Sequence, residues 1–366
     1  MKYSKILMSC FLLLFSCATE PPIEPNNTIS DFNVKVLKWF NGHNSAVTIT
    51  YDHGWRIHPI LQSTVDEVLQ RNLTMDFELV TINYNNPENF YLIEDFRENL
   101  MPNGIHFFGH GHRHINHDTL SYSEAFEDFK LCFDLMESWD LNPSVYAYPG
   151  GRGYLQSTQL ANETAGFIGA RGATLDLNEV FICPDKETEP SNWYYLHAVS
   201  TGNHSPLLIN NNDEMKEVLY SALNKSAWII IMYHSIGFPN GWGYYPFEEF
   251  TKDLDFIASN DFWCGNMDNV TKYIKEKNNF NIQKTYISSN NEMSVYRVKF
   301  SDNLDNEMFN QPLSIQFETK GDLVQTIKIV YPDSTAIENT VINNLVSFNI
   351  IPDEKEYLVY LMKNQN

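Results

Sequence analysis

The feature that most constrains the fold is an alternation of short apolar runs with longer amphipathic segments between residues 46 and 277. Strands are expected at 46–51, 75–80, 105–108, 145–148, 167–170 and 228–233. Helices are expected at 58–71, 88–101, 123–141, 155–165, 213–225, 247–260 and 267–277. Strands that alternate with helices indicate parallel β-α-β units, which form either a closed barrel or an open doubly wound sheet. In both arrangements ligands bind at the carboxyl ends of the strands.

The pattern changes after residue 278. Runs at 296–300, 313–317, 327–331 and 346–350 have an apolar residue at every second position, and in the last run these residues are Leu358, Tyr360 and Met362. A period of two predicts strands with one buried face. We therefore expect residues 280–366 to form a small antiparallel β-sandwich. This segment contains no histidine, and we expect it to be non-catalytic.

The first residues have the composition of an export signal. Lys2 and Lys5 precede an apolar run that is too short to span a bilayer comfortably and that ends in Leu-Phe-Ser-Cys at Cys17. This ending resembles the lipobox of bacterial lipoproteins, which implies that residues 1–16 are removed and that Cys17 carries lipid. Cys10 is a weaker alternative because it would leave almost no apolar region.

These features predict the order of segments along the chain. Residues 17–40 would be a flexible tether, because residues 19–30 are rich in Pro, Asn and Glu. The barrel would occupy 41–279 and the sandwich 280–366. The protein is expected to be exported and anchored by lipid to a membrane, in the periplasm or at the cell surface.

The formal net charge of −21 limits the partners. A surface this acidic has no electrostatic footprint for nucleic acid, so no nucleic-acid partner is expected. It also disfavours direct adsorption to anionic lipid. The acyl chains would therefore have to provide the anchoring.

Four histidines lie within residues 110–117, directly after the expected strand 105–108. His110 and His114 are four residues apart, so a helical turn or a tight loop brings them to one face. Neutral imidazole is the commonest protein ligand for zinc, and His53, after the first strand, is the third candidate ligand. Three nitrogens and an open position suit zinc, which lowers the pKa of bound water towards roughly 7. A solvated polar loop is the alternative interpretation.

Three polar residues could act beside such a metal. Asp52 could deprotonate the water, although an Asp between a strand and a helix also commonly caps the helix. His234 ends a late strand and could be a general acid for the leaving group, or a core histidine bonded to backbone. Arg171 could fix Asp52 by a charged hydrogen bond, or it could be a surface arginine.

Two aromatic segments could contact a substrate. Tyr148 and Pro149 begin a turn whose backbone amides could face an oxyanion, and a plain turn is an equal alternative. Trp242, Tyr244 and Tyr245 lie in one loop that could stack on sugar rings. Packing within the protein is the alternative for this loop.

With these residues in place, the chain resembles the polysaccharide deacetylases with a NodB-homology domain, carbohydrate esterase family 4, over about residues 40–280. The family motif Thr-Phe-Asp-Asp-Gly is matched by Thr50-Tyr51-Asp52-His53-Gly54, and the motif His-x-x-x-His by His110 and His114. The third motif is approximated by residues 146–151, and the final Leu-x-His by Met232-Tyr233-His234. Each match is short, but the order and spacing of all four make the set specific.

The resemblance implies a distorted barrel of about seven β-α units, a divalent metal and hydrolysis of acetyl groups on a glycan. Residue by residue, it implies Asp52 as catalytic base, His110 and His114 as metal ligands, His234 as catalytic acid, and Tyr148 and Pro149 in the substrate groove. The family's metal-binding second Asp is His53 here. A nitrogen ligand favours zinc, with nickel, cobalt or copper as alternatives.

We therefore expect an α/β fold, a distorted (β/α)7 TIM-like barrel followed by a C-terminal antiparallel β-sandwich. The expected function is that of a lipid-anchored, metal-dependent carbohydrate deacetylase, an esterase or amidase, acting on an acetylated polysaccharide or oligosaccharide. Two alternatives stay open. The chain could be a catalytically inactive glycan-binding lipoprotein, or a hydrolase of a small amide.

Overall fold

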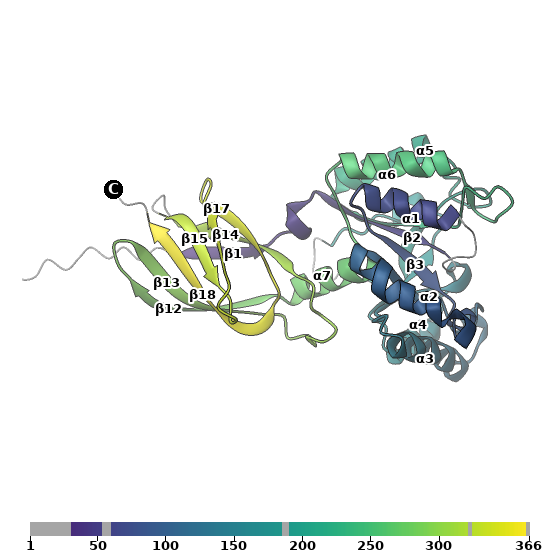
Figure 1. The fold of residues 1–366 in the computed structure, drawn as a ribbon, viewed down its shortest axis with the longest axis horizontal. Helices are drawn as coiled ribbons and strands as arrows, with labels where there is room; N and C mark the ends of the chain where they lie inside the picture. The colour runs from purple at the N-terminus through teal and green to yellow at the C-terminus, as the bar shows by residue number, and fades with distance from the viewer. Residues whose placement is uncertain (1–30, 53–59, 185–189, 321–323, 364–366) are drawn as a thin grey trace, which may run out of the picture.

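The computed structural model describes residues 31–52, 60–184, 190–320 and 324–363. They form a barrel and a β-sandwich, and helix α7 (Met267–Asn279) lies between the two (Figure 1). The expected signal segment and lipid-bearing Cys17 lie outside the described residues. Within the described part of the chain, no helix is both long enough and apolar enough to cross a bilayer.

Among the described residues, seven parallel strands close the barrel in the order β2-β3-β4-β5-β6-β7-β8, and β8 pairs back onto β2. The fold is therefore the closed TIM-like barrel and not the open sheet. The strands are β2 (Ser45–Tyr51), β3 (Met75–Leu79), β4 (Ile105–Gly109), β5 (Val145–Ala147), β6 (Gly169–Ala173), β7 (Leu196–Ser200) and β8 (Trp228–Tyr233). A further strand, β11 (Phe262–Cys264), pairs with the start of β2.

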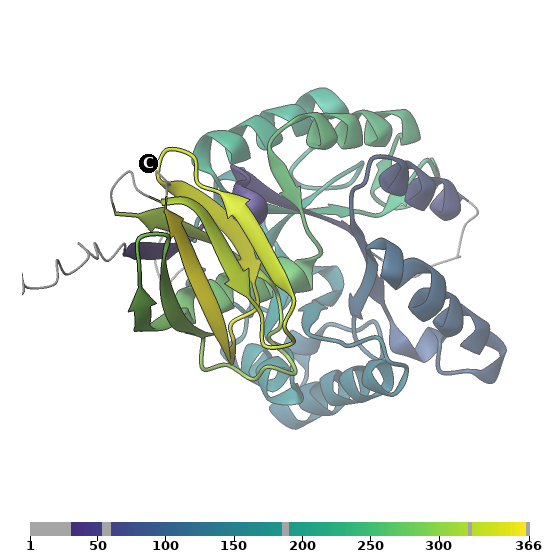
Figure 2. The same ribbon diagram turned by 60° about the vertical axis from the view of Figure 1, so that its left-hand side comes forward.

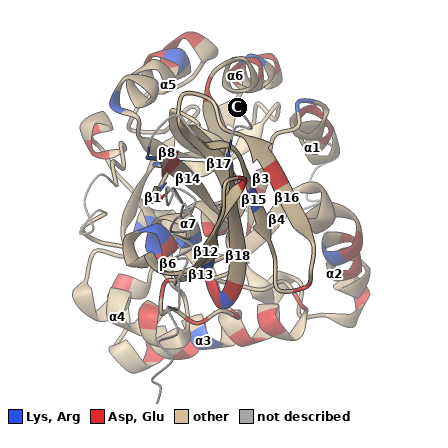
Figure 3. Ribbon diagram, turned by 90° about the vertical axis from the view of Figure 1, so that its left-hand side faces the viewer, with Lys and Arg blue, Asp and Glu red and all other residues tan. Residues whose placement is uncertain are grey.

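Helices cover the outside of the barrel (Figures 1 and 2). They are α1 (Ile60–Gln70), α2 (Phe90–Asp95), α3 (Tyr122–Ser138), α4 (Gln156–Ala165), α5 (Asn212–Lys225) and α6 (Phe247–Ser259). Most of them bury an apolar stripe; in α1 it includes Leu61, Val65 and Val68. Acidic residues are spread over the outer helices (Figure 3), in keeping with the negative net charge.

The sandwich consists of a three-stranded sheet, β1-β14-β17, and a five-stranded sheet, β12-β13-β18-β15-β16. The strands are β1 (Phe32–Val36), β12 (Asn281–Ser289), β13 (Met293–Ser301), β14 (Leu313–Thr319), β15 (Val324–Val330), β16 (Ala336–Thr340), β17 (Leu345–Ile350) and β18 (Asp353–Lys363). Strand β1 precedes the barrel in sequence but pairs with β14. The range 17–40 that was expected to be a tether therefore contains a strand of the sandwich.

The buried face that the sequence predicts for the last strand is wrong by one residue. The buried side chains of β18 are Tyr357, Val359 and Leu361, whereas the alternation was assigned to Leu358, Tyr360 and Met362. Both sets are apolar, so hydrophobicity alone does not select the buried face. A shift of one position moves every side chain of a strand to the other face of the sheet.

Helix α7 joins the two parts of the molecule. Its residues Met267 and Val270, Ile230 of β8 and Phe317 of β14 belong to one continuous apolar cluster. At its start, the N–H of Met267 donates to Oδ2 of Asp76 at 2.7 Å. Barrel interior, helix and sandwich therefore share a single core.

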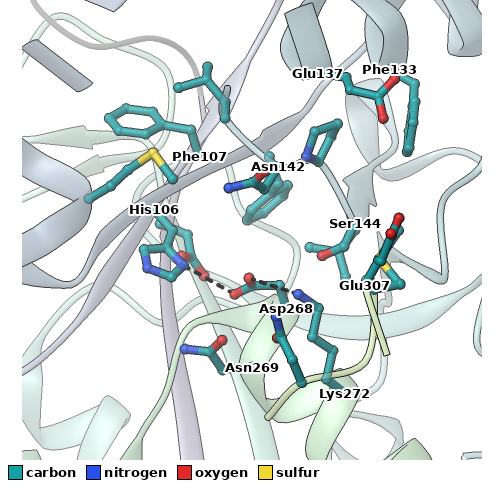
Figure 4. A pocket seen from close by; sticks show the side chains of 18 of the residues that line it. His106, Phe107, Phe133, Glu137, Asn142, Ser144, Asp268, Asn269, Lys272 and Glu307 are labelled. Carbon is teal, nitrogen blue, oxygen red and sulfur yellow. Dashed lines mark hydrogen bonds and ion pairs between the residues drawn. The ribbon is translucent and has the colours of Figure 1, made fainter. Parts of the chain in front are cut away.

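A cavity of about 550 Å³ lies at this junction, lined by residues near the starts of β3, β4 and β5, by α7 and by the segment 305–310 (Figure 4). Nδ1 of His106 lies 3.3 Å from Oδ1 of Asp268, and Nζ of Lys272 lies 3.9 Å from Oδ2 of the same carboxylate. The cavity is at the amino end of the barrel. It is separate from the carboxyl end, where the candidate residues gather.

Candidate metal centre and catalytic site

Strand alternation explains why the candidate residues meet. Residues at every second position of a strand share a face. In β4 that face includes Phe108, which lies in the cluster shared with α7, and the next position on it is His110. The same parity leads from Ile230 and Met232 of β8 to His234. The barrel therefore directs these side chains inward at the carboxyl ends of its strands.

The carboxylate of Asp52, which follows β2, is the centre of the site. Its Oδ1 lies 2.9 Å from Nε2 of His110, and its Oδ2 lies 3.1 Å from Nε2 of His234. Nη2 of Arg171 donates to the same Oδ2 at 3.2 Å, so the expected hydrogen bond between Arg171 and Asp52 is present. Arg171 and His110 are fully buried, and Asp52 is only 5% exposed.

The surroundings stabilise Asp52 as an anion. Burial raises the pKa of this carboxyl, but the charges of His110 and His234 and their hydrogen bonds outweigh burial and hold the pKa well below its ordinary value. Burial lowers the pKa of His110, but Asp52 and Glu78 outweigh it and raise that pKa. The site therefore has an anionic carboxylate at its centre, in contact with the imidazoles of His110 and His234.

The orientation of His110 suits a metal ligand. Its Nδ1 lies 2.9 Å from the carbonyl oxygen of Ala147, which accepts only if Nδ1 carries the proton. Nε2 then faces Asp52 and the open end of the barrel. A backbone hydrogen bond behind the ring is the usual way in which proteins fix the tautomer and direction of a metal-binding histidine.

Three side chains of the described residues present donors for one ion. Asp52, His110 and His114 each offer one ligand atom, and these atoms lie within 4.8 Å of one another. The ring centroids of His110 and His114 are 4.8 Å apart, and His114 is exposed to solvent. A set of imidazole nitrogens and a carboxylate oxygen fits a divalent cation such as zinc. His53, the third ligand expected from the sequence, lies outside the described residues.

Glu78 is a site residue that the sequence analysis did not identify. It is fully buried on β3, and its Oε1 accepts a hydrogen bond from Nε of Arg171 at 3.0 Å. Nη2 of Arg171 bridges Oε2 of Glu78 and Oδ2 of Asp52. The available signal was a pair of acidic residues, Asp76 and Glu78, within an expected strand, because a buried charge is tolerated only when it is paired.

Tyr148 and Pro149, expected in the substrate groove, are both shielded from solvent. The ring of Tyr148 is fully buried, and Pro149 is buried too. The N–H of Tyr148 donates to the carbonyl of Arg171 at 3.0 Å and is therefore not available to an oxyanion. The cause is the pairing of β5 with β6, which continues one residue beyond the end of β5.

The aromatic loop divides into exposed and buried parts. Trp242 is 51% exposed, and its ring centroid lies 4.3 Å from that of His234 at an interplanar angle of 74°. Tyr245 is fully buried against Tyr233, as the packing alternative predicted for this position. Trp242 therefore forms one exposed wall of the site beside His234.

No protein-family model matches the chain, and no curated protein matches it in sequence. Solved structures similar to it include a family 4 carbohydrate esterase from Streptomyces lividans in complex with acetate (13% identity, 62% of this chain and 93% of that chain, TM-score 0.41). Another is the peptidoglycan deacetylase PdaC from Bacillus subtilis (12% identity, 64% of this chain and 92% of that chain, TM-score 0.36). A third is the catalytic domain of a peptidoglycan N-acetylglucosamine deacetylase from Eubacterium rectale (13% identity, 64% of this chain and 92% of that chain, TM-score 0.38). Roughly a third of this chain has no counterpart in these three structures.

Proposed function

We propose that this chain is a divergent polysaccharide deacetylase, a hydrolase that removes acetyl groups from a glycan with the help of a divalent metal. One observation carries the proposal. The ligand atoms of Asp52, His110 and His114 lie within 4.8 Å of one another, and His234 and Arg171 contact Oδ2 of the same carboxylate. This set combines ligands for an ion with groups that can accept and donate a proton.

His110 and His114 would hold the cation, and we assign the third ligand to His53. A bound divalent cation supplies Lewis-acid polarisation of an acyl carbonyl and lowers the pKa of water. Asp52 accepts the proton of the attacking water, and Arg171 keeps its carboxylate oriented and anionic. His234 donates a proton to the leaving amine or hydroxyl oxygen.

The exposed wall formed by Trp242 supports a sugar substrate. Trp242 lies beside His234, is 51% exposed and offers a flat aromatic face to solvent. Such faces pack on the apolar side of sugar rings, while their polar edges stay wet. Acetylated oligosaccharides are therefore the substrates to test first.

Acetate release tests the proposal directly. The chain is stripped of metal with a chelator and assayed on acetylated chito- and xylo-oligosaccharides, without metal and with zinc, nickel or cobalt. We expect no turnover in the stripped protein and recovery with at least one ion. The double variant His110→Ala/His114→Ala is the control, and none of the added ions should restore its turnover. Glycan binding without turnover under all conditions would instead support the non-catalytic alternative.

We also propose that the protein is exported and that lipid on Cys17 anchors it to a membrane. The lipobox-like sequence supports this proposal. Nζ of Lys284 and Nζ of Lys320 lie 2.6 and 3.0 Å from the carboxylate of Asp31, so the chain enters the described part of the molecule at the sandwich. The lipid would then hold the sandwich nearer to the membrane than the barrel. Cys17→Ser should move the protein from the membrane fraction to the soluble one.

A further inference from the structure

The segment that carries His110 and His114 is a tight loop and not a turn of helix. Gly111 has φ of +90°, a left-handed conformation that favours glycine. A Cβ at this position would lie 2.7 Å from the carbonyl oxygen of Arg113. The separation of the two imidazoles therefore depends on how this turn is held, and not on helical periodicity.

One side of the loop is held by the segment after β3. The N–H of Thr81 donates to the carbonyl of Gly111 at 3.0 Å, and the N–H of Ile82 donates to the carbonyl of His112 at 3.1 Å. These bonds engage the carbonyl groups of the turn. The N–H groups of His112 and Arg113 point to the other side, towards α3.

Asp128 of α3 accepts both of these N–H groups. Its Oδ2 lies 3.1 Å from the backbone nitrogen of His112, and its Oδ1 lies 3.3 Å from that of Arg113. Nε of Arg113 adds a hydrogen bond to Oδ1 at 2.8 Å. Asp128 is 2% exposed, so the bonds form away from competing water. The two peptide groups that it holds lie between the candidate ligands His110 and His114.

His117 contacts Asp128 from within the same loop. It is fully buried, and its Nε2 lies 3.0 Å from Oδ2 of Asp128. Its ring stacks on that of Phe129, with the centroids 4.2 Å apart. The last of the four histidines is therefore directed to Asp128 and makes the fourth hydrogen bond to this carboxylate.

We propose that Asp128 is a positioning residue of the metal centre. By holding the peptide groups of His112 and Arg113, it fixes the turn that brings the two imidazoles to one ion. Hydrogen bonds to a carboxylate are roughly twice as strong as those between neutral groups. A carboxylate is therefore well able to hold the turn between His110 and His114 in one geometry. The inference rests on the proposed metal site and adds to it a residue that is not a ligand.

Zinc affinity of the purified full chain, measured by competition with a chromophoric chelator, tests this role. Asp128→Asn should bind zinc about 10- to 100-fold more weakly than the wild type, the usual range for a supporting residue around a metal. Gly111→Ala disturbs the same turn without changing the carboxylate, so it should lose affinity similarly. It also provides the measurement if Asp128→Asn does not fold. Arg113→Gln keeps the backbone N–H groups that Asp128 accepts, so its zinc affinity should stay close to that of the wild type.

Asp76→Asn is the matched control. Asp76 is also a buried carboxylate, 1% exposed, that accepts a backbone N–H, but it lies at the amino end of the barrel. Its loss should lower the Tm and leave zinc affinity unchanged. If Asp128→Asn and Gly111→Ala also lower only the Tm, the positioning role is wrong and the metal site stands. If the wild type binds no divalent ion, the metal site and this role are both wrong.

Discussion

The two oxygens of Asp52 have different surroundings. Oδ1 faces His110, whereas Oδ2 faces Arg171 and His234. A carboxylate in this position could accept a proton or bind the ion. We assign Asp52 the role of accepting the proton, because Arg171 and His234 hold Oδ2, the oxygen that is turned away from His110.

Asp52→Asn separates these two roles. The amide cannot accept the proton, so acetate release should fall by at least about 100-fold, within the range for general acid–base catalysis. The zinc content of the purified variant, measured by elemental analysis, should stay near that of the wild type. A variant that loses its zinc would instead make Asp52 a metal ligand.

The assignment of His234 predicts a dependence on the leaving group. An amine must be protonated as it departs, so His234→Asn should lower kcat on an N-acetylated sugar by about 100- to 10,000-fold. A phenolate leaves without a proton, so turnover of an aryl acetate should fall much less. Equal losses on both substrates would contradict the role of general acid.

Glu78 is expected to stabilise the fold through Arg171. Removing one partner of a buried ion pair leaves an uncompensated charge and costs about 3–5 kcal/mol, and Asp52 remains to offset part of this. The free energy of unfolding of Glu78→Gln, measured with urea, should therefore be about 3 kcal/mol below that of the wild type. Asp255→Asn is the matched control, because Asp255 also pairs with an arginine, Arg71, but is 64% exposed. Such surface pairs contribute about 1 kcal/mol or less.

At the scale of elements, helix α7 carries a buried acid where it meets the sandwich. Glu276 is fully buried, and its Oε1 accepts the N–H of Gln311 at 3.2 Å. Burial, with a contribution from the nearby Asp302, raises the pKa of Glu276 from 4.5 to about 8. Folding therefore favours the protonated form. Its contribution to stability is complete below pH 4.5 and is lost as the pH rises through 8.

Glu276→Gln should remove this pH dependence, because glutamine is neutral and keeps the acceptor for Gln311. Its Tm should equal that of the wild type near pH 4 and exceed it increasingly between pH 5 and pH 9. Thermal unfolding across this range is the measurement. Glu292→Gln, at an exposed position of the sandwich, is the control and should show no such trend. Parallel curves for Glu276→Gln and the wild type would contradict the prediction.

The sequence predicts strands well where they are continuously apolar. Strand β8 was expected at its observed bounds, because six apolar residues follow one another there. Strand β7 was missed because His197 interrupts its short run, and β1 was missed because its partner β14 lies almost 300 residues away along the chain. The pairing of β1 with β14 joins distant segments, which a local pattern does not contain.

The same distinction holds for the site. Asp52, His110 and His234 could be placed at strand ends from local patterns, and closure of the barrel brings them together. The bridge from Glu78 through Arg171 to Asp52 links three strands or their ends across the barrel interior. Its geometry depends on the order in which the strands close. The buried ring of Tyr148 likewise follows from the pairing of β5 with β6.

At the scale of the whole molecule, the sandwich and the barrel share one apolar core. The cluster that contains Ile230 of β8 continues through Val270 of α7 to Phe317 of β14. Tyr273 of α7 donates a hydrogen bond to the carbonyl of Leu37, in the segment that joins β1 to the barrel, at 2.9 Å. Within the described residues, the chain therefore crosses between the two parts twice, once before β2 and once at α7.

Truncation after residue 279 tests whether the barrel folds without the sandwich. The shortened chain would expose the apolar face of α7 that contacts β14 and would leave β1 without the strand that it pairs with. Each square ångström of apolar surface returned to water costs about 25 cal/mol, so exposing a few hundred removes several kcal/mol from a typical stability of 5–15 kcal/mol. We expect the truncated chain to be aggregated or to melt well below the intact protein, and the intact protein to unfold in one calorimetric transition. A truncated chain with an unchanged Tm would mean that the shared core contributes little, and two separate transitions in the intact chain would mean that barrel and sandwich fold independently.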